Sequence, residues 1–241
     1  MEHSVETLLK SVKKTASLLR LEPRPDDLPQ TASKFGGVPY SEQGEEWPVC
    51  AGCRAPLSFI CQVDLKETAL RIGPGIGFFT FFYCWECAPW GAVDEEPGSW
   101  HLRLYPRVDL SLMVRVRPPA AVTVTRSCGV SVAIAPSYPS WPTLLNIRPD
   151  AARLFAQEKD VEPSEVYEDA VEQLVGEQDY YSRVGGYPEW IQDDETPDGM
   201  ILLAQVESEE DADISWGDAG CAYLFVSQTT PHASRLIVQC H

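Results

Sequence analysis

The stretch Leu57-Ser58-Phe59-Ile60-Cys61-Gln62-Val63, followed by Gly77-Phe78-Phe79-Thr80-Phe81-Phe82, decides the fold of this chain. Both runs are rich in aromatic and β-branched residues, and Gly73, Pro74 and Gly75 lie between them, with Gly77 opening the second run. This pattern predicts two buried strands, over residues 57–63 and 77–83, that are joined as a hairpin.

A second block near the C-terminus has the same plan. Gly36-Gly37 is followed by an apolar residue and a proline, and so is Gly185-Gly186. The strand-like run at 201–206 contains Gln205, and the step from Gln62 to Gly77 has the same length as the step from Gln205 to Gly220. We therefore expect an internal duplication.

The remaining patterns predict an α+β fold built on a largely antiparallel sheet with peripheral helices. Further strands are expected at 102–105, 110–116, 121–135, 221–227 and 235–240, and helices at 150–157 and 163–175. Apolar residues from Val5 to Leu19 recur at helical spacing, so an amphipathic helix is expected over residues 5–20. Three segments of one compact unit follow: an N-terminal helix and linker (1–29), a first repeat (30–149), and an acidic helical segment with a second repeat (150–241).

Negative charge is concentrated in one segment. The net charge is −17, and residues 150–220 contain 21 acidic and 3 basic side chains, so this segment alone carries −18. Such a surface either keeps the protein soluble or docks a basic partner. Direct binding to a nucleic-acid backbone is disfavoured, because no positive patch of similar size offsets the negative field.

Four of the eight cysteines form two pairs at metal-ligand spacing: Cys50 with Cys53, and Cys84 with Cys87. A hairpin through the two predicted strands brings position 50 near 87 and position 53 near 84. Four thiolates are the ligands of tetrahedral zinc, and a site with four protein ligands is structural. Free thiols and a redox pair are the alternatives. The second block has no equivalent cysteine pair, so its hairpin must be held by packing.

Searches for catalytic motifs find none, and no catalytic residue is assigned. The four histidines lack HExxH spacing, and no serine lies on a GxSxG turn. Aromatic residues beside charge are typical interface anchors. The candidate partner-binding residues are therefore aromatic and acidic residues of the second block: Trp190, Glu209, Glu210, Asp211, Trp216 and Asp218.

These motifs, taken as a set, resemble the bacterial YwqG-like family over about residues 30–240. The strings that carry the resemblance are Lys34 to Pro39, Glu46-Trp47-Pro48, the first cysteine pair, Pro56 to Phe59, Gln62 to Leu65, Val184 to Gln192 and Trp216 to Cys221. The first block is also similar to the programmed cell death two family. These resemblances imply a duplicated α+β fold, and roles as a chaperone of a ribosomal protein or as an immunity-type protein.

We therefore expect a non-enzymatic protein-binding module that presents an acidic surface to a basic protein and is stabilised by structural zinc. A hydrolase or transferase is the alternative, with Asp218 and Glu189 as first candidates for a carboxylate site between the repeats. A zinc-ribbon nucleic-acid binder is the second alternative. The absence of a signal-like or membrane-spanning apolar run predicts a cytoplasmic protein.

Overall fold

A computed structural model describes residues 4–23, 28–73, 75–88, 98–156, 161–176, 182–229 and 233–241. The helices are α1 (Val5–Val12), α2 (Trp141–Ile147), α3 (Ala151–Phe155) and α4 (Pro163–Val175), with short 3-10 turns η1 (Leu65–Glu67) and η2 (Glu210–Ala212). The strands are β1 (Lys14–Pro23), β2 (Lys34–Phe35), β3 (Ser58–Asp64), β4 (Phe78–Tyr83), β5 (Trp100–Tyr105), β6 (Cys128–Ser137), β7 (Ser182–Gly185), β8 (Met200–Glu207), β9 (Cys221–Ser227) and β10 (Ser234–Gln239).

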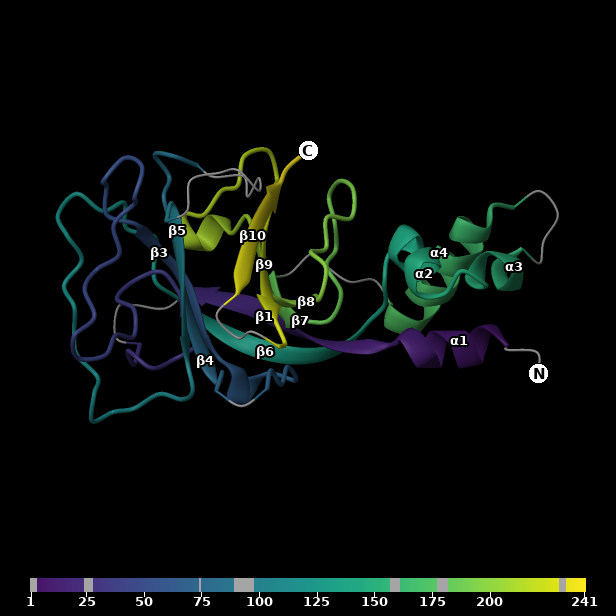
Figure 1. Cartoon of the computed structure of the whole chain (residues 1–241), viewed down its shortest axis with the longest axis horizontal. Coiled ribbons are helices and arrows are strands. Elements are labelled where there is room, and N and C mark those ends of the chain that lie inside the picture. The colour runs from purple at the N-terminus through teal and green to yellow at the C-terminus, as the bar shows by residue number, and fades with distance from the viewer. Residues whose placement is uncertain are drawn as a thin grey trace.

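The ten strands form one sheet in the order β10-β9-β8-β7-β1-β6-β2-β3-β4-β5. All of its neighbouring strands run antiparallel. The long strands β1 and β6 lie side by side at its middle and lead out of the sheet to a group of helices at one end of the molecule (Figure 1). Four strands follow on each side of this central pair.

The four strands on either side pair in matching registers. Lys34 of β2 lies opposite Gln62 of β3, as Arg183 of β7 lies opposite Gln205 of β8. A β-bulge interrupts β3 between Phe59 and Cys61, and a bulge interrupts β8 between Leu202 and Ala204. Each bulge therefore falls at the same distance before the glutamine of its strand.

Both glutamines are fully buried and hold a neighbouring loop. The Oε1 atom of Gln62 accepts a hydrogen bond from the Tyr40 N–H at 2.7 Å, and that of Gln205 accepts one from the Glu189 N–H at 2.9 Å. The Gln62 amide also donates to the carbonyls of Gln30 and Ala32. The side chain of Gln62 thus fixes two separate loop segments to strand β3.

The main core joins the two sides of the sheet. Aromatic residues of β4 and of the segment before β9 meet there: Phe81 and Tyr83 contact the Trp216 ring at centroid distances of 6.4 and 4.9 Å. Strands β3, β8 and β9 are buried along most of their length. Because strands from both ends of the sheet contribute to this core, neither side covers its apolar face alone.

The helices pack in a smaller cluster of their own. Leu8, Leu9 and Val12 of α1 lie against Phe155 of α3 and Tyr167 of α4, and all five side chains are buried. The Tyr167 hydroxyl donates to the Pro139 carbonyl at 2.6 Å. The helices therefore cover one another and not the main face of the sheet.

Two sequence predictions about the N-terminal half were wrong. The expected helix over residues 5–20 ends at Val12, and Lys14–Pro23 is the central strand β1. Residues 16–19 are buried on both faces of the sheet, so the spacing of their apolar residues does not distinguish a strand from a helix. The strand expected at 110–116 is a loop, which pairs through Leu112 and Val114 with the loop at 41–43.

The other predicted elements match the structure with shifted ends. Strands β3, β4, β5, β8, β9 and β10 and helices α3 and α4 lie where patterns placed them. The run at 121–135 becomes a strand only from Cys128 onward. Helix α2 was not predicted, although the Ser140 side chain caps its N-terminus and Pro142 stands in its first turn.

The buried amide of Gln62 yields a stability prediction. Gln62→Leu should lower the free energy of unfolding by about 3 kcal/mol or more, because one backbone N–H and two carbonyls lose their partner inside the protein. The exposed Gln43→Leu is the matched control and should change stability by less than about 0.5 kcal/mol. Chemical denaturation measures both, and equal effects would contradict the role given to Gln62.

Candidate metal centre and acidic pocket

The four paired cysteines meet at one end of the β3–β4 hairpin. Their sulfur atoms all lie within 4.8 Å of one another. The Sγ atoms of Cys50 and Cys87 are 3.6 Å apart, and those of Cys53 and Cys84 are 3.5 Å apart. The expected pairing of position 50 with 87 and of 53 with 84 is confirmed, and the four cysteines are free thiols compatible with a metal site.

Each cysteine pair lies on a turn of the same kind. The N–H of Arg54 donates to the Cys50 carbonyl, and the N–H of Ala88 donates to the Cys84 carbonyl. Both of these residues have positive φ angles, 66° and 41°, which turn the chain sharply after the second cysteine. This geometry directs both sulfurs of a pair to the same side.

The two buried cysteines of the cluster pack against apolar side chains. Cys50 and Cys84 are buried with Leu57, Phe59 and Phe82, whereas Cys53 and Cys87 are exposed. Burial would raise the pKa of Cys50, but hydrogen bonds from the Cys53 N–H and the neighbouring thiols lower it to about 7. The cluster thus favours one thiolate near neutral pH, and the thiolate is the form that binds metals.

A second feature is a pocket of about 490 Å³ at the second hairpin, which we call the acidic pocket. It is lined by Glu189, Trp190, Ile191, Glu207, Ser208, Glu209, Ala219, Gly220 and His241. The described residues of its wall therefore include three glutamates and no lysine or arginine. A pocket of this size and charge suits a cationic side chain.

The glutamates of the acidic pocket differ in their environment. Glu189 accepts a bidentate pair of hydrogen bonds from the buried Arg183 at 2.5 Å. Glu209 accepts a hydrogen bond from the Ser182 hydroxyl at 2.6 Å, and burial, helped by the negative charge of Glu207, raises its pKa to about 7. Burial also raises the pKa of Glu207. Among the described residues, neither Glu207 nor Glu209 forms an ion pair, although the positive charge of Arg183 partly opposes the rise in the pKa of Glu207.

The candidate partner-binding residues fall into three groups. Trp190 and Glu209 line the acidic pocket. Glu210, Asp211 and Asp218 are exposed nearby, and the Asp218 carbonyl accepts from the N–H of the pocket residue His241. The Trp216 side chain is only 2% exposed and packs in the main core, so it is not available to a partner.

Sequence reasoning missed Glu207 as a pocket residue and missed the pairing of Arg183 with Glu189. Glu207 ends a buried strand, and its neighbour Ser208 begins the turn. The sequence signal for Glu207 was an acidic residue directly after an apolar run. Only the folding of the chain, however, brings the turn at 189–191 beside Glu207 to form the pocket.

The fold and the cysteine cluster define a protein with a single antiparallel sheet and a four-cysteine site compatible with a metal. Residues 33–234 match a domain of unknown function, DUF1963, and this match spans most of the chain. The protein therefore belongs to the DUF1963 family. No curated protein matches the chain.

Among the helices of the described residues, none has both the length and the apolar character that a bilayer-spanning helix needs.

The raised pKa of Glu209 predicts a pH-dependent stability. The folded protein holds the proton of Glu209 more tightly than the unfolded chain does. The contribution of Glu209 to the free energy of unfolding is therefore largest below the unfolded pKa of 4.5, and it is lost as the pH rises through about 7. Glu209→Gln removes this loss, and its stability relative to wild type should rise by up to about 3 kcal/mol between pH 4.5 and pH 8. Urea denaturation at several pH values measures this difference.

The exposed Glu210→Gln is the matched control, because it lies in the same turn outside the pocket wall. Parallel pH curves for wild type and Glu209→Gln would contradict a buried carboxyl at position 209.

Proposed function

We propose that the four-cysteine cluster binds one zinc ion and that its role is structural. Four thiolates match the ligand preference of zinc, and the two positive-φ turns already gather the sulfurs in one place. Four protein ligands leave no position for a substrate. Zinc would therefore fasten the loop before β3 to the loop after β4 and perform no chemistry.

The zinc proposal predicts a metal content of one ion per chain. Cys53→Ser or Cys84→Ser should abolish it and lower the melting temperature, because three remaining thiolates form a weaker, open site. Cys240→Ser, outside the cluster, should keep the metal and serves as the control. Elemental analysis of protein prepared without chelator tests this, and metal-free wild-type protein would refute it.

We further infer that the two sides of the sheet arose by duplication, as expected for a YwqG-like protein. The matching registers of Lys34 with Gln62 and of Arg183 with Gln205 support it. So do the two bulges and the positive φ angles of both glycine pairs. Only the first side contains cysteine pairs, so the metal site would be an addition to one copy.

The function that the geometry supports best is that of a cytoplasmic protein-binding module, chaperone-like or immunity-like, for a basic protein. The observation that carries this proposal is the acidic pocket, in which Glu207 and Glu209 form no ion pair with any other described residue. Exposed Glu210, Asp211 and Asp218 extend the negative surface beyond its rim. A lysine or arginine of the partner would occupy the pocket, beside the Trp190 side chain.

Electrostatic docking predicts an association that depends on salt. The triple variant Glu210→Lys, Asp211→Lys, Asp218→Lys should lower the association rate about tenfold or more, because surface charges act mainly on encounter. Folding stability should change little, since these side chains are exposed. Capture of partners from native lysate at 50 mM and 1 M salt, with wild type and variant, followed by rate measurements on the recovered protein, tests this.

A matched control carries the same change of charge at the other end of the molecule. Glu165→Lys, Asp169→Lys, Glu172→Lys alters three exposed residues of α4 and should leave capture unchanged. Equal loss in both triple variants would mean that only net charge matters. Recovery of no basic protein by wild type at low salt would remove the docking proposal, and recovery of nucleic acid would favour the zinc-ribbon alternative.

A hydrolase or transferase is the second candidate, and one observation favours it. Glu209 has a pKa raised to about 7 beside Glu207 in a pocket, and such a carboxyl suits proton transfer near neutral pH. Glu189 fits this role less well, because Arg183 holds its carboxylate. Asp218 is exposed and does not line the pocket. Under this alternative, Glu209 would be the acid–base residue.

A further inference from the structure

Corresponding places on the two sides of the sheet each hold a buried cation. Lys34 in β2 and Arg183 in β7 lie opposite the two equivalent glutamines, and their exposed fractions are only 3% and 2%. Burying a cation is costly unless an anion accompanies it. The two sides meet this requirement differently.

Arg183 receives its anion from within the chain. Glu189 follows the glycine pair at 185–186, its N–H is held by Gln205, and its carboxylate binds the Arg183 guanidinium through two hydrogen bonds. The second side of the sheet therefore contains a complete ion pair at this place.

The first side has no such carboxylate. Tyr40 takes the place of Glu189, because its N–H is held by Gln62 in the same way. Its ring turns into a buried aromatic group with Phe78 and Tyr105, at centroid distances of 5.3 and 5.1 Å. Lys34 is thus left without an anion from the corresponding turn.

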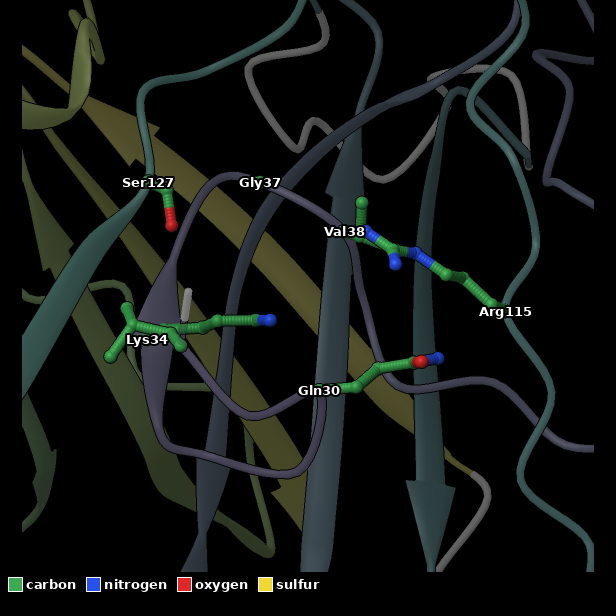
Figure 2. A pocket seen from close by; sticks show the side chains of 7 residues that line it. Gln30, Lys34, Gly37, Val38, Arg115 and Ser127 are labelled. Carbon is green, nitrogen blue, oxygen red and sulfur yellow. The ribbon is translucent and has the colours of Figure 1, made fainter. Parts of the chain in front are cut away.

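Lys34 instead faces a pocket of about 440 Å³ that contains a second cation. Figure 2 shows the Lys34 ammonium and the Arg115 guanidinium pointing into the same space from opposite sides. The described residues that line it are Leu28, Gln30, Lys34, Gly37, Val38, Arg115 and Ser127, and none of these is acidic. Within the described part of the chain, neither cation has an ion-pair partner.

The wall of this pocket is held in place by hydrogen bonds. The Gln30 amide donates to the carbonyls of Pro39, at 2.9 Å, and Val114, at 2.7 Å, which are the neighbours of Val38 and Arg115. The Ser127 hydroxyl stands beside Gly37, and it has no hydrogen-bond partner among the described residues. The pocket therefore presents two cations and a hydroxyl donor from fixed backbone positions.

Burial, together with the positive charge of Arg115, lowers the pKa of Lys34 to about 8. Lys34 is therefore still mostly protonated at pH 7, where its charge and that of Arg115 face each other with no acidic side chain between them among the described residues. An anion between them would relieve both the repulsion and the cost of burial.

We propose that this pocket binds the carboxylate group of a small organic acid. The carboxylate of Glu189 fills the equivalent place on the second side, and carboxylates pair with arginine in a bidentate geometry. The aliphatic side chains of Leu28 and Val38 would contact the body of the ligand, and the volume suits a small molecule. This site does not depend on the proposed protein docking or on zinc.

Thermal unfolding with defined salts tests the proposal. Sodium acetate, sodium butyrate and sodium phosphate are titrated into the full-length protein at constant ionic strength and pH 7. Acetate and butyrate should raise the melting temperature saturably, by roughly 3–6 °C at ten times the dissociation constant, with butyrate effective at lower concentration. Phosphate should act more weakly than butyrate.

Lys34→Met should abolish the response to acetate while the protein itself becomes equally or more stable, because an uncompensated buried cation is removed. Arg115→Gln, at an exposed residue, should weaken the response at least fivefold and stays informative if Lys34→Met fails to fold. Arg117→Gln, also exposed, is the matched control.

No response of wild type to acetate and butyrate would overturn the proposal. So would a stronger response to phosphate than to butyrate, or an unchanged response in Arg115→Gln.

Discussion

The antiparallel ladder between β1 and β6 is the interaction on which the rest of the structure depends. It pairs Lys14 with Ser137 at one end and Pro23 with Cys128 at the other, and it joins the two four-stranded sides. Strand β7 pairs with β1 and strand β2 pairs with β6. Because both sides attach to this ladder, their apolar faces can meet in one core, which a smaller sheet could not close.

Because both sides attach to the same central ladder, matching positions on the two sides can carry different side chains. Gln62 and Gln205 hold the same kind of turn, so backbone geometry is retained while side chains change. Arg183 has a carboxylate partner within the chain, whereas Lys34 has none among the described residues. Under the proposed carboxylate site, a buried position whose charge is compensated on one side and left open on the other would become a binding site without any change of fold.

Much of the four-cysteine cluster could be predicted from the sequence, and little of the acidic pocket could. Cys50 and Cys87 approach because the strands between them form a local hairpin, and hairpin pairing follows from apolar runs and turn residues. Glu189 and Glu209 come together only through the packing of β7, β8 and the turn at 189–191. Trp216 shows the same limit, since an aromatic residue beside glycine can be an anchor or, as here, part of the core.

The sequence by itself determined the antiparallel hairpins, the pairing of the cysteines and the matching spacing of the two blocks, because each depends on residues that are near in the chain or repeat at a fixed interval. Tertiary structure decided that residues 14–23 form the central strand, since burial on both faces gives no distinguishing period. It also decided which cations have anions. Charge compensation depends on distances between segments far apart in sequence, such as Lys34 and Arg115, and those distances exist only in the folded chain.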